Sequence, residues 1–169
     1  MALLEILRAP HPLLKTKAKP VEVIDDTLRR LAADMFETMY KAPGIGLAAP
    51  QIGVLQRLVV VDVAEGDDRR PLVLVNPEID WSSDEVATAE EGCLSLPNQF
   101  AEVTRPEAVQ VSYLDQHGES RELAAEGLLA RCVQHEIDHL DGVLFVDHLS
   151  ALRRNMILRR LAKTKRTRD

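Results

Sequence analysis

The stretch CVQHEIDHLDG, residues 132 to 142, carries side chains suited to metal chemistry. His135, Glu136 and His139 form the pattern His-Glu-x-x-His. On a helix, two histidines four positions apart lie about 40° apart around the axis and about 6 Å along it, so both imidazoles can bind one ion. The glutamate beside them is free to carry a proton. The pattern predicts a metal-dependent hydrolase, and the alternative is an amphipathic helix with incidental histidines.

A catalytic metal needs a further ligand, because two histidines rarely hold it alone. The third ligands that are usual in zinc proteases are absent from this sequence. Phe145 stands where a metzincin has its third histidine, and the chain between Asp147 and Asp169 contains no Asp or Glu that would complete a thermolysin-like site. His148 follows an apolar stretch, and its position is more typical of a partly exposed histidine before the last helix.

The two cysteines are the remaining candidates. Cys132 shares a helix face with His135 but lies about 10 Å along the axis from His139, too far for three ligands that each reach about 2.0 to 2.3 Å to one ion. We therefore expect Cys132 to be a buried core or pocket-wall thiol. Cys93, in the segment EEGCLSLP, follows a glycine that lets the backbone approach closely. We expect a site of Cys93, His135 and His139 with one open position for water.

Three segments together resemble a known family. GIGLAAPQ (Gly44 to Gln51), EGCLS (Glu91 to Ser95) and QHEIDH (Gln134 to His139) have the order and separation typical of peptide deformylases, and the resemblance covers essentially the whole chain. It implies removal of the N-formyl group from the N-terminal methionine of nascent polypeptides, with release of formate. The alternatives are another metal-dependent N-acyl amidase or peptidase, and a deformylase-like protein that binds without catalysis.

The resemblance also implies roles for individual residues. Glu136 is the acid and base, and the Gln51 side chain and the Leu94 backbone N–H form an oxyanion hole. Glu91 braces the cysteine loop by pairing with Arg105, with a surface ion pair as the alternative. Nitrogen and thiolate ligands suit one divalent metal among Zn²⁺, Ni²⁺, Co²⁺ and Fe²⁺, and the family implies Fe²⁺ in the cell.

The substrate is expected to lie in an apolar pocket for the methionine side chain and along the GIG segment as an added strand. Phe100 stands where some family members carry a substrate-contacting arginine, and Arg131 stands where an apolar pocket residue is expected, so both positions leave the substrate preference open. The residues expected to border the substrate are Ile45, Gly46, Glu91, Phe100, Leu128, Arg131 and Cys132.

Composition and charge indicate the number of domains, the cellular compartment and the partners of the protein. The 169 residues, 46% of them hydrophobic, predict one catalytic domain over residues 1–169. Two cysteines and the absence of a signal-like N-terminus predict a reducing, cytoplasmic setting. No apolar run approaches the roughly 20 residues that a membrane span needs. We expect a monomer. The net charge is −6, yet residues 153 to 169 hold eight Arg or Lys and one Asp. We expect Arg153 to Arg168 to dock on ribosomal RNA, with a solvated helix end as the alternative.

The expected order of helices and strands predicts an α+β fold of mostly antiparallel strands around the central metal-binding helix. An N-terminal helix precedes this core in the sequence, and a C-terminal helix follows it. Helical spacing indicates an N-terminal helix capped by Asp25 or Asp26 and ended by Pro43 and Gly44, a helix from Leu128 to near Gly142, and a final helix capped by Ser150. The segment GIGLAAPQIG is expected to be a loop or irregular strand. Strands are expected at 57–63, 71–75, 107–114 and 119–123, the last two joined by a turn at 116–118.

Overall fold

The computed structural model describes residues 2–64 and 68–168, and the side chains as far as residue 163. Three α-helices and seven strands lie within those residues, together with three short 3-10 helices. In chain order the elements are η1 (Pro12–Lys15), α1 (Asp26–Lys41), β1 (Gly46–Ala48), η2 (Ala49–Ile52), β2 (Leu58–Val61), β3 (Leu72–Ser82), β4 (Val86–Cys93), β5 (Leu96–Pro106), β6 (Ala108–Leu114), β7 (Ser120–Glu126), α2 (Gly127–Leu140), η3 (Phe145–His148) and α3 (Ala151–Arg168).

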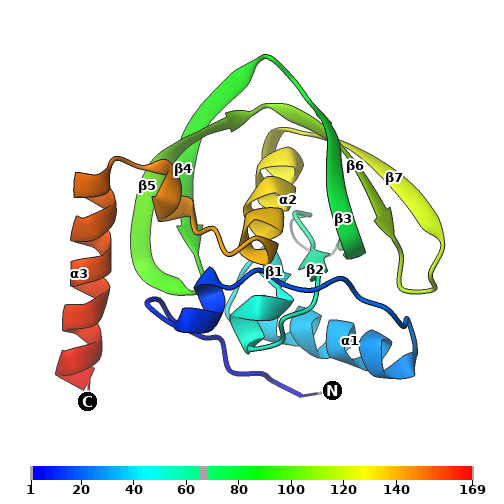
Figure 1. The fold of residues 1–169 in the computed structure, drawn as a ribbon, viewed down its shortest axis with the longest axis horizontal. Coiled ribbons are helices and arrows are strands. Elements are labelled where there is room, and N and C mark those ends of the chain that lie inside the picture. The colour runs from blue at the N-terminus through cyan, green and yellow to red at the C-terminus, as the bar shows by residue number, and fades with distance from the viewer. Residues whose placement is uncertain (1, 65–67, 169) are drawn as a thin grey trace.

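Five strands form one antiparallel sheet in the order β1-β2-β3-β6-β7 (Figure 1). Strand β2 reads LVVV and is buried throughout, because both faces of the sheet are covered at this point. Successive side chains of a strand point to opposite faces. Val59 and Val61 accordingly contact the α2 side, and Leu58 and Val60 contact the α1 side. The α+β prediction is confirmed.

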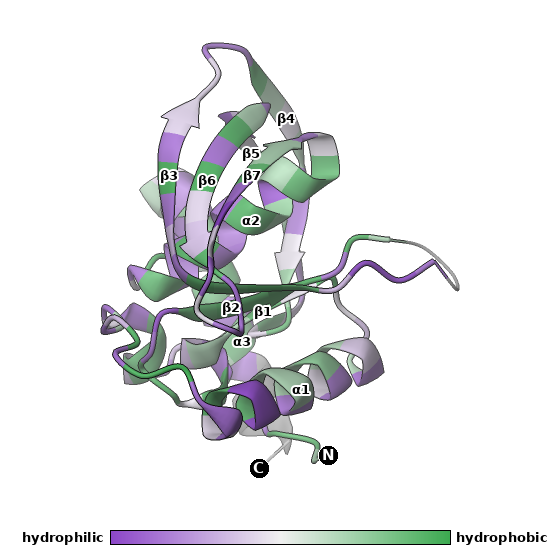
Figure 2. Ribbon diagram, turned by 90° about the vertical axis from the view of Figure 1, so that its right-hand side faces the viewer, coloured by the Kyte–Doolittle hydropathy of each residue, from purple (hydrophilic) through white to green (hydrophobic). Residues whose placement is uncertain are grey.

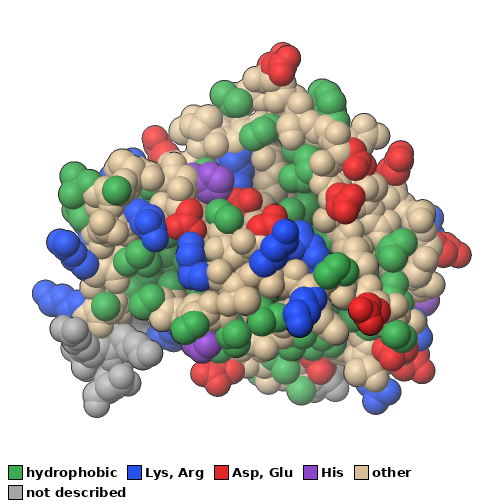
Figure 3. Space-filling view, viewed as in Figure 1, with side chains coloured by type: hydrophobic (Ala, Val, Ile, Leu, Met, Phe, Trp, Pro, Cys, Tyr) green, Lys and Arg blue, Asp and Glu red, His purple; other side chains and the backbone are tan. Residues whose placement is uncertain are grey.

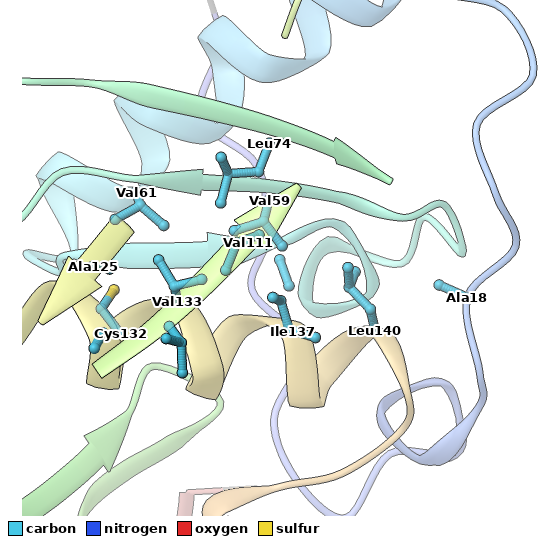
Figure 4. Close-up of a cluster of buried hydrophobic side chains, with 13 residues drawn as sticks. Ala18, Val59, Val61, Leu74, Val111, Ala125, Cys132, Val133, Ile137 and Leu140 are labelled. Carbon is cyan, nitrogen blue, oxygen red and sulfur yellow. The ribbon is translucent and has the colours of Figure 1, made fainter. Parts of the chain in front are cut away.

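Helix α2 packs its apolar stripe on one face of this sheet. Val133, Ile137 and Leu140 lie at helical spacing and point towards Val59 and other strand side chains (Figure 4). Helix α1 covers the opposite face of the sheet with its buried residues. Figure 2 shows that hydrophilic and hydrophobic residues alternate along α1. The metal-binding helix is therefore held on a rigid apolar support.

The strands β4 and β5 form a separate two-stranded sheet. One side of this hairpin packs on η3 and α3, where Val103 and Phe145 share a buried cluster with Ile157. The hairpin continues at its base into the five-stranded sheet, because β3 leads into β4 and β5 leads into β6. Side chains that link the hairpin to α2 add further contacts between the two parts.

The helix boundaries follow the sequence prediction closely. The Asp25 side chain accepts a hydrogen bond from the Leu28 N–H at 3.0 Å, as an N-cap does. Helix α1 ends at Lys41, just before Pro43. At the start of α3, the Ser150 hydroxyl accepts a hydrogen bond from Arg153 N–H at 3.3 Å.

The strand prediction was incomplete. The strand expected at 71–75 continues to Ser82, because register shifts after Val75 and after Ile79 accommodate a chain that contains Pro77. The hairpin β4–β5 was missed altogether. In β5 the buried positions Ala101, Val103 and Arg105 alternate, but the last is charged, so the apolar period of a strand is broken in the sequence. In β4 the one buried residue is Glu91, so no apolar alternation marks that strand either.

Among the described residues, no helix is long and apolar enough to cross a membrane.

Candidate metal centre

The three expected ligands come together from two elements. His135 and His139 lie one helical turn apart on α2, with ring centroids 5.0 Å from each other. Cys93 is the last residue of β4, and its Sγ lies 3.3 Å from His139 Nε2. One ligand atom from each residue lies within 4.8 Å of the others. The thiol and imidazoles therefore form a Cys/His/His metal site.

The local structure around Cys93 explains why a glycine precedes it. A Cβ atom on Gly92 would lie 2.6 Å from Cε1 of Phe100, because the aromatic ring packs directly on the glycine backbone. After Cys93 the chain turns within two residues into β5, so the expected cysteine loop is the tight end of a hairpin. A side chain at position 92 would therefore require the exposed Phe100 ring to move away from the ligand strand.

His135 is oriented by a buried carboxylate. Its Nδ1 donates a hydrogen bond to Glu91 Oε1 at 3.0 Å, which leaves Nε2 for a metal. Arg105 binds the same carboxylate with two bonds, Nε to Oε2 at 2.6 Å and Nη2 to Oε1 at 2.9 Å. The expected pair of Glu91 and Arg105 is therefore present, and it is buried rather than on the surface. Burial alone would raise the pKa of Glu91, but hydrogen bonds from His135 and Arg105 lower it to about 2, so this carboxylate is charged at neutral pH.

The residue next to the first histidine is equipped to exchange protons. The Glu136 side chain is buried, and its Oε1 has no hydrogen-bond partner among the described residues. Burial is the main cause that raises the pKa of Glu136 to about 7, against the opposing charges of His135 and Arg105. A carboxyl group with this pKa can both accept and donate a proton near neutral pH. Burial also lowers the pKa of His139, which keeps that imidazole neutral, as a ligand must be.

Gln51 lies on η2 with its amide orientation fixed. Its Oε1 accepts a hydrogen bond from Ala48 N–H at 2.9 Å, and its Nε2 donates to the Ser95 hydroxyl at 3.1 Å and approaches Cys93 Sγ at 3.6 Å. The side chain is only 1% exposed. The amide N–H group of Gln51 is therefore directed towards the turn that contains Leu94. Ser95 was assigned no role from the sequence, although it belongs to the EGCLS segment that marks this turn.

A cleft of about 950 Å³ opens in front of these groups. Glu136, His135 and Cys93 line it, together with Gln51 and Leu94. Three large apolar residues of its wall are partly open to solvent: Ile45 is 41% exposed, Leu128 53% and Phe100 60%. The remaining residues expected to border the substrate, Gly46, Glu91, Arg131 and Cys132, also line the cleft.

The polar groups of some cleft residues are occupied within the protein. The buried Cys132 thiol donates to the Ile45 carbonyl at 3.6 Å, as expected of a pocket-wall residue. Arg131 neither extends into solvent nor leaves the cleft, since its guanidinium binds Glu91. His148 is bonded to Asp138 at 2.8 Å and does not belong to the ligand cluster. Of the basic tail, the side chains of Lys165, Arg166 and Arg168 lie outside the described residues.

The chain is similar to known proteins over almost its whole length. The polypeptide deformylase family model matches residues 3–155. A peptide deformylase of Rhizobium meliloti is 54% identical over 169 residues, covering 99% of this chain and 97% of that protein, and one of Phenylobacterium zucineum is 56% identical over 164 residues, covering 96% and 97%. A crystal structure of a peptide deformylase from Legionella pneumophila is 51% identical with a TM-score of 0.93, covering 99% of this chain and 98% of that one. The Ehrlichia chaffeensis peptide deformylase in complex with actinonin is 40% identical with a TM-score of 0.94, covering 98% and 99%.

Proposed function

The chain belongs to the peptide deformylase family, which removes the N-formyl group from nascent peptides, and we propose that Glu136 is the acid and base of this hydrolysis. The supporting observation is the buried carboxyl group with an unpartnered oxygen beside the Cys/His/His site. We also propose the identity of the metal, the hydrogen-bond donors to the reacting carbonyl, the substrate pocket and the place of the protein in the cell. The whole chain acts as one catalytic domain.

The donor set suits a borderline metal, because two imidazoles and a thiolate accept Fe²⁺, Zn²⁺, Ni²⁺ or Co²⁺. We propose Fe²⁺ as the metal in the cell. Iron beside a thiolate is sensitive to oxygen, so the Fe²⁺ form should lose activity in air and the Ni²⁺ form should keep it. A Ni²⁺-loaded enzyme that decays in air as fast as the Fe²⁺ form would contradict this assignment.

When bound, a divalent metal supplies a water of lowered pKa and polarises the carbonyl of the substrate. Glu136 would accept a proton from the attacking water molecule as the water oxygen forms its bond to the formyl carbon. The carbonyl oxygen gains negative charge, and the Gln51 Nε2–H and the Leu94 backbone N–H donate hydrogen bonds to it, each worth roughly 3 to 4 kcal/mol. Glu136 then returns the proton to the amine nitrogen as the C–N bond breaks. The products are formate and a free N-terminal methionine.

The substrate lies in the cleft with the methionine side chain against Ile45, Leu128 and Cys132. Strand β1 supports this arrangement, because it is at the edge of the five-stranded sheet and no second strand pairs with it in residues 2–64 and 68–168. A peptide added along Gly46 to Ala48 would use main-chain hydrogen bonds, which do not depend on sequence. Phe100 at the mouth of the cleft offers an aromatic contact to the residues after methionine.

The discriminating experiment is formate release from formyl-Met-Ala-Ser, compared with acetate release from acetyl-Met-Ala-Ser. We expect formate from the metal-loaded wild type, no acetate, and a loss of activity in Glu136→Ala with unchanged metal content. The absence of formate from the metal-loaded wild type would refute the proposal. Release of acetate at a similar rate would instead indicate a broader N-acyl amidase.

We also propose that α3 docks this enzyme on ribosomal RNA, as a monomer in the cytoplasm. Basic side chains gather along the edge of the molecule formed by α3 (Figure 3), and Arg153, Arg159 and Arg160 are exposed. Deleting the tail would also remove Leu161 from a buried cluster, so charge reversal is the cleaner test. Arg153→Glu with Arg159→Glu should weaken ribosome binding and its salt dependence but spare the hydrolysis of short formyl peptides.

The matched control for this test is Arg30→Glu, an exposed helical arginine on α1, which Figure 1 shows on the far side of the molecule from α3. It should leave ribosome binding unchanged. Equal binding by the α3 double variant and the wild type would remove the ribosome from the proposal.

A further inference from the structure

Helix α2 has two faces of different chemistry. The apolar face packs on the five-stranded sheet. The face towards the β4–β5 hairpin carries Arg131, His135 and Asp138, which share one side of the helix because they are four and three positions apart. The hairpin contributes Glu91 and Arg105 to the same contact. The metal-binding helix and the cysteine hairpin are thus joined partly by buried charges.

Arg131 of α2 makes hydrogen bonds to both strands of the hairpin. Its Nη2 donates to the Ala87 carbonyl on β4 at 2.8 Å, and its Nη1 donates to the Val103 carbonyl on β5 at 2.9 Å. The same Nη1 lies 2.5 Å from Glu91 Oε2. The side chain is 12% exposed. One guanidinium therefore ties the helix to both strands and to the carboxylate that holds His135.

This link matters because the ligands belong to two different parts of the fold. His135 and His139 move with α2, and Cys93 moves with a hairpin that belongs to a separate sheet. Arg105 and Glu91 are both on the hairpin, so their pair does not by itself connect the two parts. At its base the hairpin is continuous with the five-stranded sheet, since β3 leads into β4 and β5 into β6. Cys93 is at the other end of the hairpin, where the distance between its sulfur and the histidine nitrogens also depends on the side chains that cross between the hairpin and α2.

We propose that Arg131 is a positioning residue of the metal centre, which holds the hairpin against α2 and keeps Glu91 in place to accept the His135 Nδ1 hydrogen bond. The inference rests on the proposed function, since it concerns the same metal site. It assigns Arg131 a role in metal binding in addition to its place in the cleft wall. Lysine cannot replace it fully, because an ammonium lacks the planar fork that serves two carbonyls and a carboxylate together.

The test measures metal binding in the absence of substrate. The variants are Arg131→Met, Arg131→Lys and, as matched control, Arg57→Met. Arg57 is also a partly buried arginine anchored to α2, through the Leu140 carbonyl and Asp141, but it does not contact Glu91. The readouts are competition with a chelator and the thiolate-to-metal absorption band of the Co²⁺ form, which Cys93→Ser should abolish.

Residues that orient a metal ligand typically contribute about 10- to 100-fold to metal affinity. We expect a loss in this range and an altered Co²⁺ band for Arg131→Met, a smaller loss for Arg131→Lys, and wild-type behaviour for Arg57→Met. If Arg131→Met does not fold, the lysine variant decides. Wild-type affinity and an unchanged band in a folded Arg131 variant would overturn the proposal.

These results are independent of the activity assay. A wild type that binds Co²⁺ with a thiolate band but releases no formate would refute the proposed function and leave the role of Arg131 in metal binding standing.

Discussion

Substituting Gly46 by alanine tests how closely strand β1 approaches the catalytic carboxyl group. The added methyl would lie 2.6 Å from Glu136 Oε2, 2.9 Å from Glu136 Cγ and 2.8 Å from Cys132 Sγ. Normal contact distances are about 3.5 to 4.0 Å, so the Glu136 side chain must move by roughly 1 Å. Both side chains are buried but line the cleft, so the cleft is the space into which the carboxyl group can move.

A displacement of about 1 Å in a catalytic group typically costs on the order of 100-fold in rate. We expect kcat for formyl-Met-Ala-Ser to fall by about this factor, because the group that carries the proton is misplaced. Overpacking should also lower the free energy of unfolding by about 1 to 3 kcal/mol. Metal content should stay near that of the wild type, since none of the three atoms nearest to the added methyl belongs to Cys93 or the two histidines.

A double-mutant cycle separates this cause from a blocked channel. In the Glu136→Ala background the Oε2 and Cγ atoms are absent, so two of the three nearest contacts of the new methyl disappear and the loss of stability should shrink. A blocked channel would instead raise KM and leave kcat largely unchanged. Gly46→Ala with kcat within about threefold of the wild type, or an equal loss of stability in both backgrounds, would show that the added methyl does not displace Glu136.

Three further predictions concern stability. Phe145→Ala should lower the free energy of unfolding by about 3 to 5 kcal/mol, because Phe145 is fully buried; chemical denaturation measures this loss. The substitution should also weaken metal binding, measured by competition with a chelator, because the Phe145 ring stacks on His135 with 6.3 Å between centroids. Removing the metal should lower the midpoint of thermal unfolding, since a ligand at 100 times its Kd stabilises the folded state by about 2.7 kcal/mol; identical midpoints with and without chelator would contradict this. Burial acts to raise the pKa of Asp147, but hydrogen bonds from the Lys15 ammonium and the Leu144 N–H outweigh it and hold the pKa below its usual value of 3.8. The charged Asp147 carboxylate therefore stabilises the fold at pH values above 3.8, and this stabilisation is lost as the pH falls through the lowered pKa of Asp147. Asp147→Asn should lower the free energy of unfolding by about 1 kcal/mol near pH 7 and hardly at all in strong acid. Denaturation curves across this pH range test the prediction.

The parts of the site that the sequence predicted are those set by local geometry. The His135 and His139 pair requires only a helix, whose spacing of 3.6 residues per turn is the same in any protein. The choice of Cys93 as third ligand followed from excluding other residues, and the structure brings its sulfur beside His139. The family resemblance then supplied the roles of Glu136 and Gln51, which remain proposals.

Other features were open in the sequence because they depend on contacts between distant segments. Arg131 was an exception to an expected apolar wall, and only the packed hairpin provides the two carbonyls and the carboxylate that its guanidinium binds. Arg105 interrupted the apolar alternation of β5, so that strand was missed, although the same arginine is buried against Glu91.

Ligand types and helical spacing are local properties of the chain, so the chemistry of the site can be predicted from the sequence alone. How that chemistry is tuned depends on the packed fold. The burial that raises the pKa of Glu136, the approach of Gly46 to its carboxyl group and the joining of α2 to the cysteine hairpin all arise from segments far apart in the sequence. Solvent exclusion and close packing depend on every neighbouring segment at once, and no periodicity within one segment specifies them.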